Sequence, residues 1–218
     1  MIVVVGHPAY ADAPDSEGCA GGLAVEVASA ARRRGGAVEL VGKVGNDGAG
    51  DAVVVALGRL GIGHAALLRD PARPTPVLVP AAADNAGAEV DAESPEERLL
   101  PEDSAARPGL DAADVELALR FLPGAGVIVL ADTLSESAIA AGVEGASFSS
   151  ARLVVVVPAG ASPPDVPQGA VVLEAPVADD GSFGRLVGVF AGALDAGVDT
   201  VAAFEEAVAV SGWERVVV

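Results

Sequence analysis

Two short stretches of the sequence combine residue types that could bind a small ligand. The pair Gly21–Gly22 directly precedes a helix-like segment, and glycines allow a backbone to approach a ligand closely. The same pair also makes a flexible helix start that needs no ligand. Asp132 and Thr133 follow an apolar run, and ligands bind at strand ends in open sheets. Capping of the next helix explains Asp132 and Thr133 equally well, so both interpretations stay open.

A third glycine-rich stretch spans residues 42–51 and reads GKVGNDGAGD. Its glycines at Gly45, Gly48 and Gly50 allow a tight turn with positive φ. Asp47 is placed to cap the helix that follows. This interpretation is purely structural and needs no ligand.

Several common catalytic and binding centres are missing from the sequence. His7 and His64 have no acidic or histidine partners at ligand spacing, which argues against a metal site. The single cysteine, Cys19, excludes an internal disulfide and a cysteine-based zinc site. No serine lies in a G-x-S-x-G elbow and no G-x-G-x-x-G follows Val5, so serine hydrolysis and the dinucleotide-binding fingerprint are both unsupported.

Short apolar runs that alternate with helix-like segments must position the candidate ligand-binding residues. Strands are expected at 2–5, 38–41, 65–68, 76–79, 127–131, 153–157, 171–173 and 215–218, and helices at 21–34, 49–60, 111–121, 135–142, 183–196 and 200–210. Such alternation predicts an α/β fold whose parallel strands are joined by right-handed helical crossovers. We expect a single domain over residues 1–218.

Charge and composition exclude several classes of partner. Residues 81–109 are rich in Ala, Asp, Glu and Pro, and we expect an acidic, partly disordered loop there. The chain has 31 acidic and 13 basic residues and a net charge of −18, which argues against nucleic acids and anionic membranes as partners. No apolar run approaches the roughly 20 residues of a membrane span, and no secretory signal is present. The sequence therefore predicts a cytoplasmic protein.

The stretch from Gly21 to Leu60 resembles the N-terminal half of the ribokinase-like (PfkB) carbohydrate kinases. The shared features are the glycine pair, a helix, a strand, and the turn at 43–50 that leads into a second helix. The resemblance implies a three-layer fold in which helices flank a mainly parallel central sheet. Only about fourteen residues separate Gly6 from Gly21, so the lid strands that the family inserts there are expected to be reduced or absent.

The resemblance also assigns substrate contacts. It implies a substrate-binding aspartate shortly after the first strand, and Asp12 is the nearest residue of that type. It implies that the backbone of Gly21 and Gly22 approaches the substrate. Glu26 stands where the family usually has an asparagine that touches the sugar.

A second stretch of resemblance lies near the C-terminus, in the helix from Leu186 to Gly197. In the family this helix begins with Gly-Ala-Gly-Asp: the amides form an anion hole for the transferred phosphate, and the aspartate activates the substrate hydroxyl. An ungapped match places Gly181, Ser182 and Phe183 on the first three of these residues. It places Gly184 on the catalytic aspartate, and the resemblance then implies an anion hole at Gly181, Ser182 and Gly184. Gly184 has no side chain to take a proton, and Phe183 is expected to add bulk where the phosphate should lie.

Other parts of the kinase site also depart from the family pattern. Asp179 and Asp180 are the nearest carboxylates to the missing base, and they would reach the site only if the loop were rebuilt. The family's Asn-x-x-Glu, which helps to organise Mg²⁺, has no counterpart at 158–161, which reads PAGA. We therefore expect no metal ligand from this chain.

These departures predict a degenerate sugar kinase homologue that is catalytically impaired and acts as a small-molecule binding or assembly module. The alternative is an active ATP-dependent phosphotransferase that acts on a sugar or nucleoside hydroxyl. An active enzyme would need ATP and Mg²⁺, and a binding module would need no cofactor. The resemblance implies a sugar or nucleoside as ligand and allows a homodimer.

Overall fold

The computed structural model describes residues 1–11, 19–78, 107–177 and 181–213. In this part of the chain, six strands form one sheet in the order β5-β4-β1-β7-β8-β9, and every neighbouring pair is parallel. The strands are β1 (Ile2–Val5), β4 (Val38–Gly45), β5 (Leu67–Asp70), β7 (Val127–Leu130), β8 (Arg152–Val157) and β9 (Val171–Glu174). The predicted α/β fold with a parallel central sheet is confirmed.

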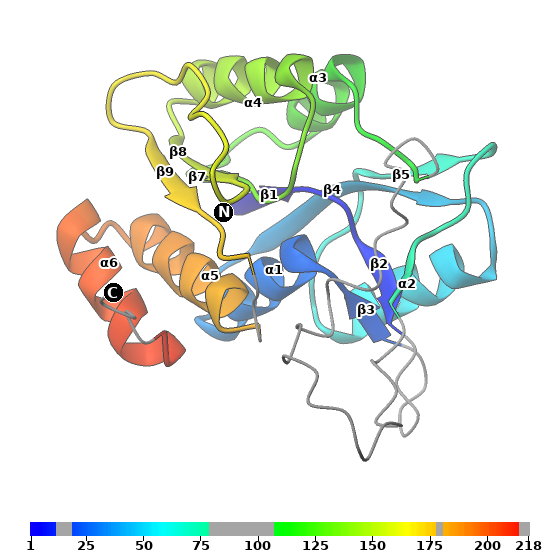
Figure 1. Cartoon of the computed structure of the whole chain (residues 1–218), viewed down its shortest axis with the longest axis horizontal. Coiled ribbons are helices and arrows are strands. Elements are labelled where there is room, and N and C mark those ends of the chain that lie inside the picture. The colour runs from blue at the N-terminus through cyan, green and yellow to red at the C-terminus, as the bar shows by residue number, and fades with distance from the viewer. Residues whose placement is uncertain (12–18, 79–106, 178–180, 214–218) are drawn as a thin grey trace.

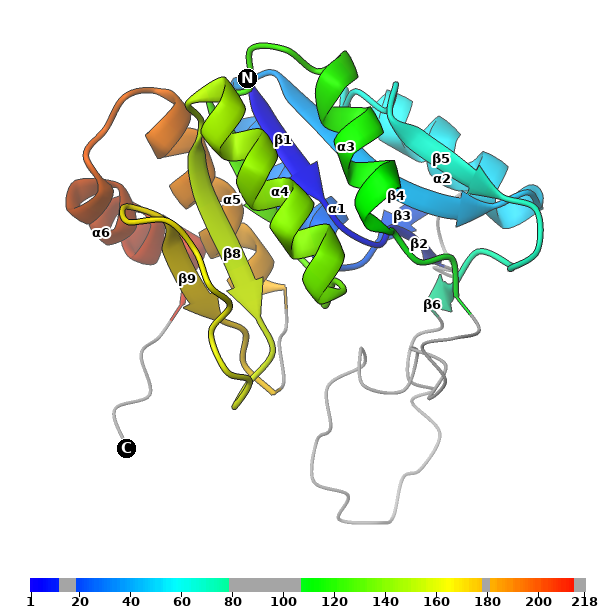
Figure 2. The same cartoon turned by 90° about the horizontal axis from the view of Figure 1, so that it is seen from above.

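Helices cover both faces of the sheet (Figures 1 and 2). One face carries α3 (Ala112–Phe121) and α4 (Glu136–Ser149), and the other carries α1 (Leu23–Arg33), α2 (Gly48–Arg59) and α5 (Ser182–Asp195), with α6 (Thr200–Ser211) packed on α5. The four residues of β1 are fully buried: Ile2 and Val4 face the α1 side, and Val3 and Val5 face the α3 side. Burial on both faces explains why β1 is an unbroken apolar run.

A second, three-stranded sheet lies near the ends of β1 and β4 (Figure 2). It consists of β2 (Ala9–Ala11), β3 (Cys19–Gly21) and β6 (Val77–Leu78), in the order β3-β2-β6. Such short strands carry too little periodicity to be predicted, and the sequence pattern indicates only β6. A small sheet at this place fits the expectation of a reduced lid.

The strand β4 is longer than predicted and changes the interpretation of the glycine-rich stretch. It continues to Gly45, and α2 begins at Gly48, so the chain turns within two residues as predicted. The predicted positive φ is wrong, because neither Gly45, Gly48 nor Gly50 has one. Gly45 is required by close packing instead: a Cβ there would lie 2.6 Å from the backbone nitrogen of Thr75 and 2.7 Å from the carbonyl oxygen of Arg73.

The remaining predicted elements differ from the observed ones mainly at their ends. Helix α4 extends to Ser149, well beyond the predicted end at residue 142. The predicted strand at 215–218 and most of the acidic segment at 81–109 lie outside the described residues. No helix in the described ranges is long and apolar enough to cross a membrane.

The carboxylate of Asp47 ties the start of α2 to the segment before β6. It accepts hydrogen bonds from the backbone nitrogen of Gly50 at 2.8 Å, the backbone nitrogen of Thr75 at 2.8 Å and the hydroxyl of Thr75 at 2.7 Å. Burial alone would raise the pKa of Asp47, but these hydrogen bonds and the charge of Arg69 outweigh burial and lower it. The predicted helix cap is confirmed, and it also holds a long-range contact.

Helices α1 and α5 pack closely along what we call the glycine seam, formed by Gly184, Gly188 and Gly192. These glycines are four residues apart and therefore lie on one face of α5. A Cβ at Gly188 would lie 2.5 Å from the Cβ of Ala30 on α1 and would also overlap the carbonyl oxygen of Val27. Only a residue without a side chain allows the two helices to approach this closely.

We expect Gly188→Ala to lower the free energy of unfolding by about 1–3 kcal/mol, the usual cost of overpacking a core. The control is Gly48→Ala, because Gly48 is also helical but has no atom within 4 Å of an added Cβ. The control should be neutral or slightly stabilising, since alanine is the better helix former. Urea unfolding followed by circular dichroism measures both variants, and equal stabilities would contradict the close packing of the seam.

Candidate functional site

The order in which successive strands are placed in the central sheet reverses between β1 and β7. From β1 the strands continue through β4 to β5 on one side, and from β7 they continue through β8 to β9 on the other. In open α/β sheets, the crevice at the carboxyl ends of the strands at such a switch point is the usual place for a ligand. The residues that follow β1 and β7 therefore form the candidate site.

A direct hydrogen bond joins the residues after β1 and β7. The backbone N–H of His7 donates to Oδ2 of Asp132 at 2.6 Å. Gly6 permits this approach, because a Cβ there would overlap the same oxygen and would lie 2.7 Å from the Cβ of Ala24. Ser135 caps α4 through its hydroxyl, so helix capping does not account for Asp132. Of the two interpretations left open by the sequence, helix capping is therefore wrong for Asp132, and a contact with a ligand stays a prediction.

A cavity of about 350 Å³, which we call the carboxyl-edge cavity, opens at this edge of the sheet. It is bounded by the last two residues of β8, by residues that follow β7, β8 and β9, and by the first residue of α1. The lining residues are Leu23, Ala131, Asp132, Thr133, Val156, Val157, Pro158, Ala159, Ala175, Pro176 and Val177. Its size lies within the range of small-ligand sites, and of the described residues in its lining only Asp132 and Thr133 have polar side chains.

Helix α5 starts after β9, at the same edge of the sheet. Gly181 is its N-cap and has a φ of 84°, a conformation that favours glycine, and Ser182 is its first residue. Phe183 is only 4% exposed, and the centroid of its ring lies 5.4 Å from that of Trp213. The expectation that Phe183 fills the phosphate space is therefore wrong, because its ring belongs to the hydrophobic core.

Glu26 on α1 lies against the first turn of α5. A Cβ at Gly184 would lie 2.5 Å from Oε2 of Glu26 and 2.7 Å from its Cβ. A Cβ at Gly181 would lie 3.7 Å from each carboxylate oxygen of Glu26. The sequence assigns Glu26 to the sugar and the two glycines to the anion hole, and the structure brings all three together. Sequence spacing alone does not show this contact, because the residues come from opposite ends of the chain.

The glycine pair brings the start of α1 to the end of β1. Gly21 ends β3, where a Cβ would lie 2.7 Å from Cδ1 of Leu78. Gly22 is the N-cap of α1 with a φ of 93°, and a Cβ there would lie 3.2 Å from the carbonyl oxygen of His7. Both glycines therefore have structural reasons to be glycine, and both lie near the candidate site.

The other carboxylates named from the sequence cannot be placed. Asp12, Asp179 and Asp180 lie outside the described residues. Within the described ranges, no group of three or more His, Cys, Asp or Glu side chains is arranged to hold a metal ion. In the loop after β8, Pro158 and Ala159 line the carboxyl-edge cavity with apolar atoms.

His7 belongs to the candidate site, although its isolation in the sequence did not suggest a role. Burial, aided by the positive charge of Arg107, lowers the pKa of His7 to about 4. Hydrogen bonds to the backbone carbonyls of Thr133 and Pro108 act to raise this pKa, but burial outweighs them. His7 is therefore neutral at pH 7. Its position directly after β1 is the one sequence signal that could have identified it.

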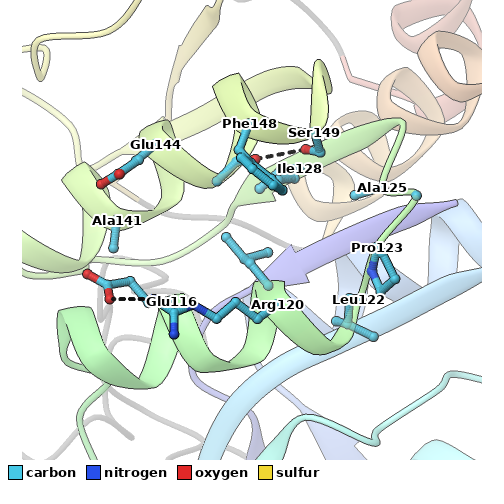
Figure 3. Close-up of a pocket in the computed structure, with 13 residues that line it drawn as sticks. Glu116, Arg120, Leu122, Pro123, Ala125, Ile128, Ala141, Glu144, Phe148 and Ser149 are labelled. Carbon is cyan, nitrogen blue, oxygen red and sulfur yellow. Dashed lines mark hydrogen bonds and ion pairs between the residues drawn. The ribbon is translucent and has the colours of Figure 1, made fainter.

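A larger cavity of about 590 Å³ lies between α3 and α4 (Figure 3). Its lining includes Ile128, the exposed ring of Phe148, and Glu116, which lies 4.0 Å from Arg120 in an ion pair. Among the described residues, those that the sequence assigns to the kinase-like site line neither cavity. The larger cavity includes residues 122–125, which lie just before β7, so it lies toward the amino ends of the strands and away from the edge where the switch point favours a ligand. We therefore take the carboxyl-edge cavity as the candidate site.

We expect the free energy of unfolding to decrease as the pH is lowered from about 6.5 toward 5. The folded state resists protonation of His7, whereas the unfolded chain binds the proton near the ordinary pKa of about 6.5. The variant His7→Gln should show a flatter profile in this window, which urea unfolding at several pH values measures. Identical profiles for the two proteins would contradict the burial of His7.

No protein-family model and no curated protein sequence matches the chain, but solved structures match its fold. Sa239 superposes with a TM-score of 0.68 at 12% identity, over 98% of this chain and 94% of that one. A putative ribokinase II from E. coli, in complex with ATP and Mg²⁺, matches with a TM-score of 0.63 at 14% identity, over 96% and 91% of the two chains. Arabidopsis thaliana ribokinase, complexed with ribose and ATP, matches with a TM-score of 0.63 at 16% identity, over 96% and 90%. The chain therefore has a ribokinase-like fold, in a short form of 218 residues.

Proposed function

We propose that the protein binds a sugar or nucleoside in the carboxyl-edge cavity and that its phosphoryl transfer from ATP is impaired. The observation that carries the proposal is Gly184, because the first turn of α5 offers no side chain where the resemblance implies the catalytic base. Loss of a general base typically costs about 10²–10⁴-fold in rate. The ribose and ATP held by Arabidopsis ribokinase support the proposed class of ligand.

The walls of the carboxyl-edge cavity favour an uncharged ligand that carries hydroxyl groups. Among the described residues, neither lysine nor arginine lines the cavity, and the one charged side chain in the lining is the carboxylate of Asp132. A carboxylate accepts hydrogen bonds from hydroxyl groups and repels a phosphate. The hydrogen bond from His7 holds Asp132 in place, so the ligand would meet an oriented acceptor.

The start of α5 is the place where the chain would hold the triphosphate. Backbone N–H groups and the helix dipole favour anions at such an N-terminus. The putative ribokinase II from E. coli holds ATP with Mg²⁺, and we propose the same pair for this chain when it binds a nucleotide. Since the described residues offer no cluster of metal ligands, Mg²⁺ would arrive bound to the phosphates.

A second candidate is an active ATP-dependent phosphotransferase that acts on a sugar or nucleoside hydroxyl. Two observations favour it. Phe183 is turned into the core, so its ring does not cover the start of α5. The carboxylate of Glu26 lies beside Gly184, so the site has a carboxylate although α5 has none there.

The surroundings of the protein are proposed from its charge. A net charge of −18 disfavours nucleic acids and anionic membranes as partners, because both are polyanions. We propose a cytoplasmic protein, and the family resemblance allows a homodimer.

Calorimetric titration with a panel of sugars and nucleosides, with and without Mg·ATP, tests the proposed function. We expect at least one acceptor to bind with a Kd in the micromolar to millimolar range. Asp132→Asn should weaken that binding about tenfold or more, because a hydrogen bond to a charged group contributes about 1.5–3 kcal/mol. The matched control is Glu116→Gln in the α3–α4 cavity, which should bind like the wild type.

Formation of ADP in the same mixtures separates the two candidates. Binding with slow or undetectable ADP formation supports the impaired protein, and turnover at a rate typical of enzymes supports the active one. A folded protein that binds no acceptor would contradict both.

A further inference from the structure

We infer that Glu26 supplies the carboxylate that position 184 lacks and acts as the general base in residual phosphoryl transfer. The inference goes beyond ligand binding, and it rests on the proposed binding of an acceptor in the carboxyl-edge cavity. It assigns a base on α1, whereas the family resemblance implies one on α5.

The first argument is the position of the carboxylate. Oε2 of Glu26 is 2.5 Å from the place where a Cβ at Gly184 would lie. This is about the distance that separates Cβ from a carboxylate oxygen within one aspartate side chain. Glu26 therefore places a carboxylate oxygen about as far from the Cβ position of residue 184 as an aspartate at that position would place its own carboxylate oxygens.

The second argument is the packing of the two helices. An added Cβ at Gly184 would lie only 2.7 Å from the Cβ of Glu26, which is far inside van der Waals contact. Because Gly188 keeps the next turn of α5 equally close to α1, the helices cannot separate locally without opening the glycine seam. The space between them holds one carboxylate, and that carboxylate comes from α1.

The third argument is the electrostatic setting of Glu26. It lies in the first turn of α1 and beside Gly181, the N-cap of α5, so two helix N-termini are near it. Helix N-termini stabilise a negative charge, and a general base must be ionised before it can accept a proton. Leu23, one turn earlier on α1, lines the carboxyl-edge cavity and would also lie 3.4 Å from a Cβ at Gly184. Glu26 therefore lies about one turn of α1 from a residue that lines the carboxyl-edge cavity.

The proposed step conserves atoms and charge. The acceptor hydroxyl gives its proton to the carboxylate of Glu26 while its oxygen forms a bond to the γ-phosphorus of ATP. The bond between that phosphorus and the β–γ bridging oxygen breaks, and ADP leaves with the electron pair. Glu26 then returns the proton to water.

The test compares Glu26→Gln with Glu39→Gln. Both substitutions remove a half-buried carboxylate with almost no change in shape, and Glu39 lies on β4, outside the lining of the carboxyl-edge cavity. We measure acceptor affinity by calorimetry, thermal unfolding, and the rate of ADP formation with saturating acceptor. Glu26→Gln should lower kcat by at least about 10²-fold, while acceptor affinity stays within about threefold and the protein remains folded. Glu39→Gln should match the wild type in all three measurements.

Three results would overturn the inference. Wild-type kcat in Glu26→Gln would show that another group takes the proton. A loss of acceptor affinity with unchanged kcat would show that Glu26 only binds the ligand. A wild-type protein that binds the acceptor but forms no ADP would remove the base role and leave the proposed binding function intact, whereas a wild-type protein that binds no acceptor would overturn both.

Discussion

The close contact between α1 and α5 is the constraint on which the candidate site depends. Gly184, Gly188 and Gly192 remove the side chains that would otherwise keep the two helices apart. The same contact fixes the start of both helices at one edge of the sheet. Glycine at position 184 therefore has two roles. It permits the close packing of α1 against α5, and it leaves room for the carboxylate of Glu26.

Packing at the switch point of the sheet completes the site. Gly6 lets Asp132 approach the end of β1, and Gly22 lets α1 begin beside the carbonyl of His7. These contacts leave little freedom to the polar groups around the carboxyl-edge cavity, and groups held in place lose less entropy when a ligand binds. In the described part of the chain, a three-stranded sheet lies beside this edge.

The sequence predicts the central sheet and most helices because buried parallel strands and amphipathic helices leave periodic patterns over many residues. It does not predict β2 and β3, whose three residues each are too few for a pattern, or the continuation of β4 to Gly45. For the site, the resemblance identifies Gly181, Gly184 and Glu26 one by one. Their mutual contact depends on the approach of α1 to α5, which is a tertiary property. The direction of the Phe183 ring depends in the same way on Trp213, which lies beyond α6.

A crystal structure of the protein with a bound acceptor and a non-hydrolysable ATP analogue tests the central claim most directly. The claim is that the edge between β1, β7 and the start of α5 is the functional site. We expect the acceptor in the carboxyl-edge cavity, with one hydroxyl within hydrogen-bond distance of Glu26 and the terminal phosphate at the first turn of α5. Ligands bound only in the α3–α4 cavity, or an acceptor with no hydroxyl near Glu26, would contradict the claim.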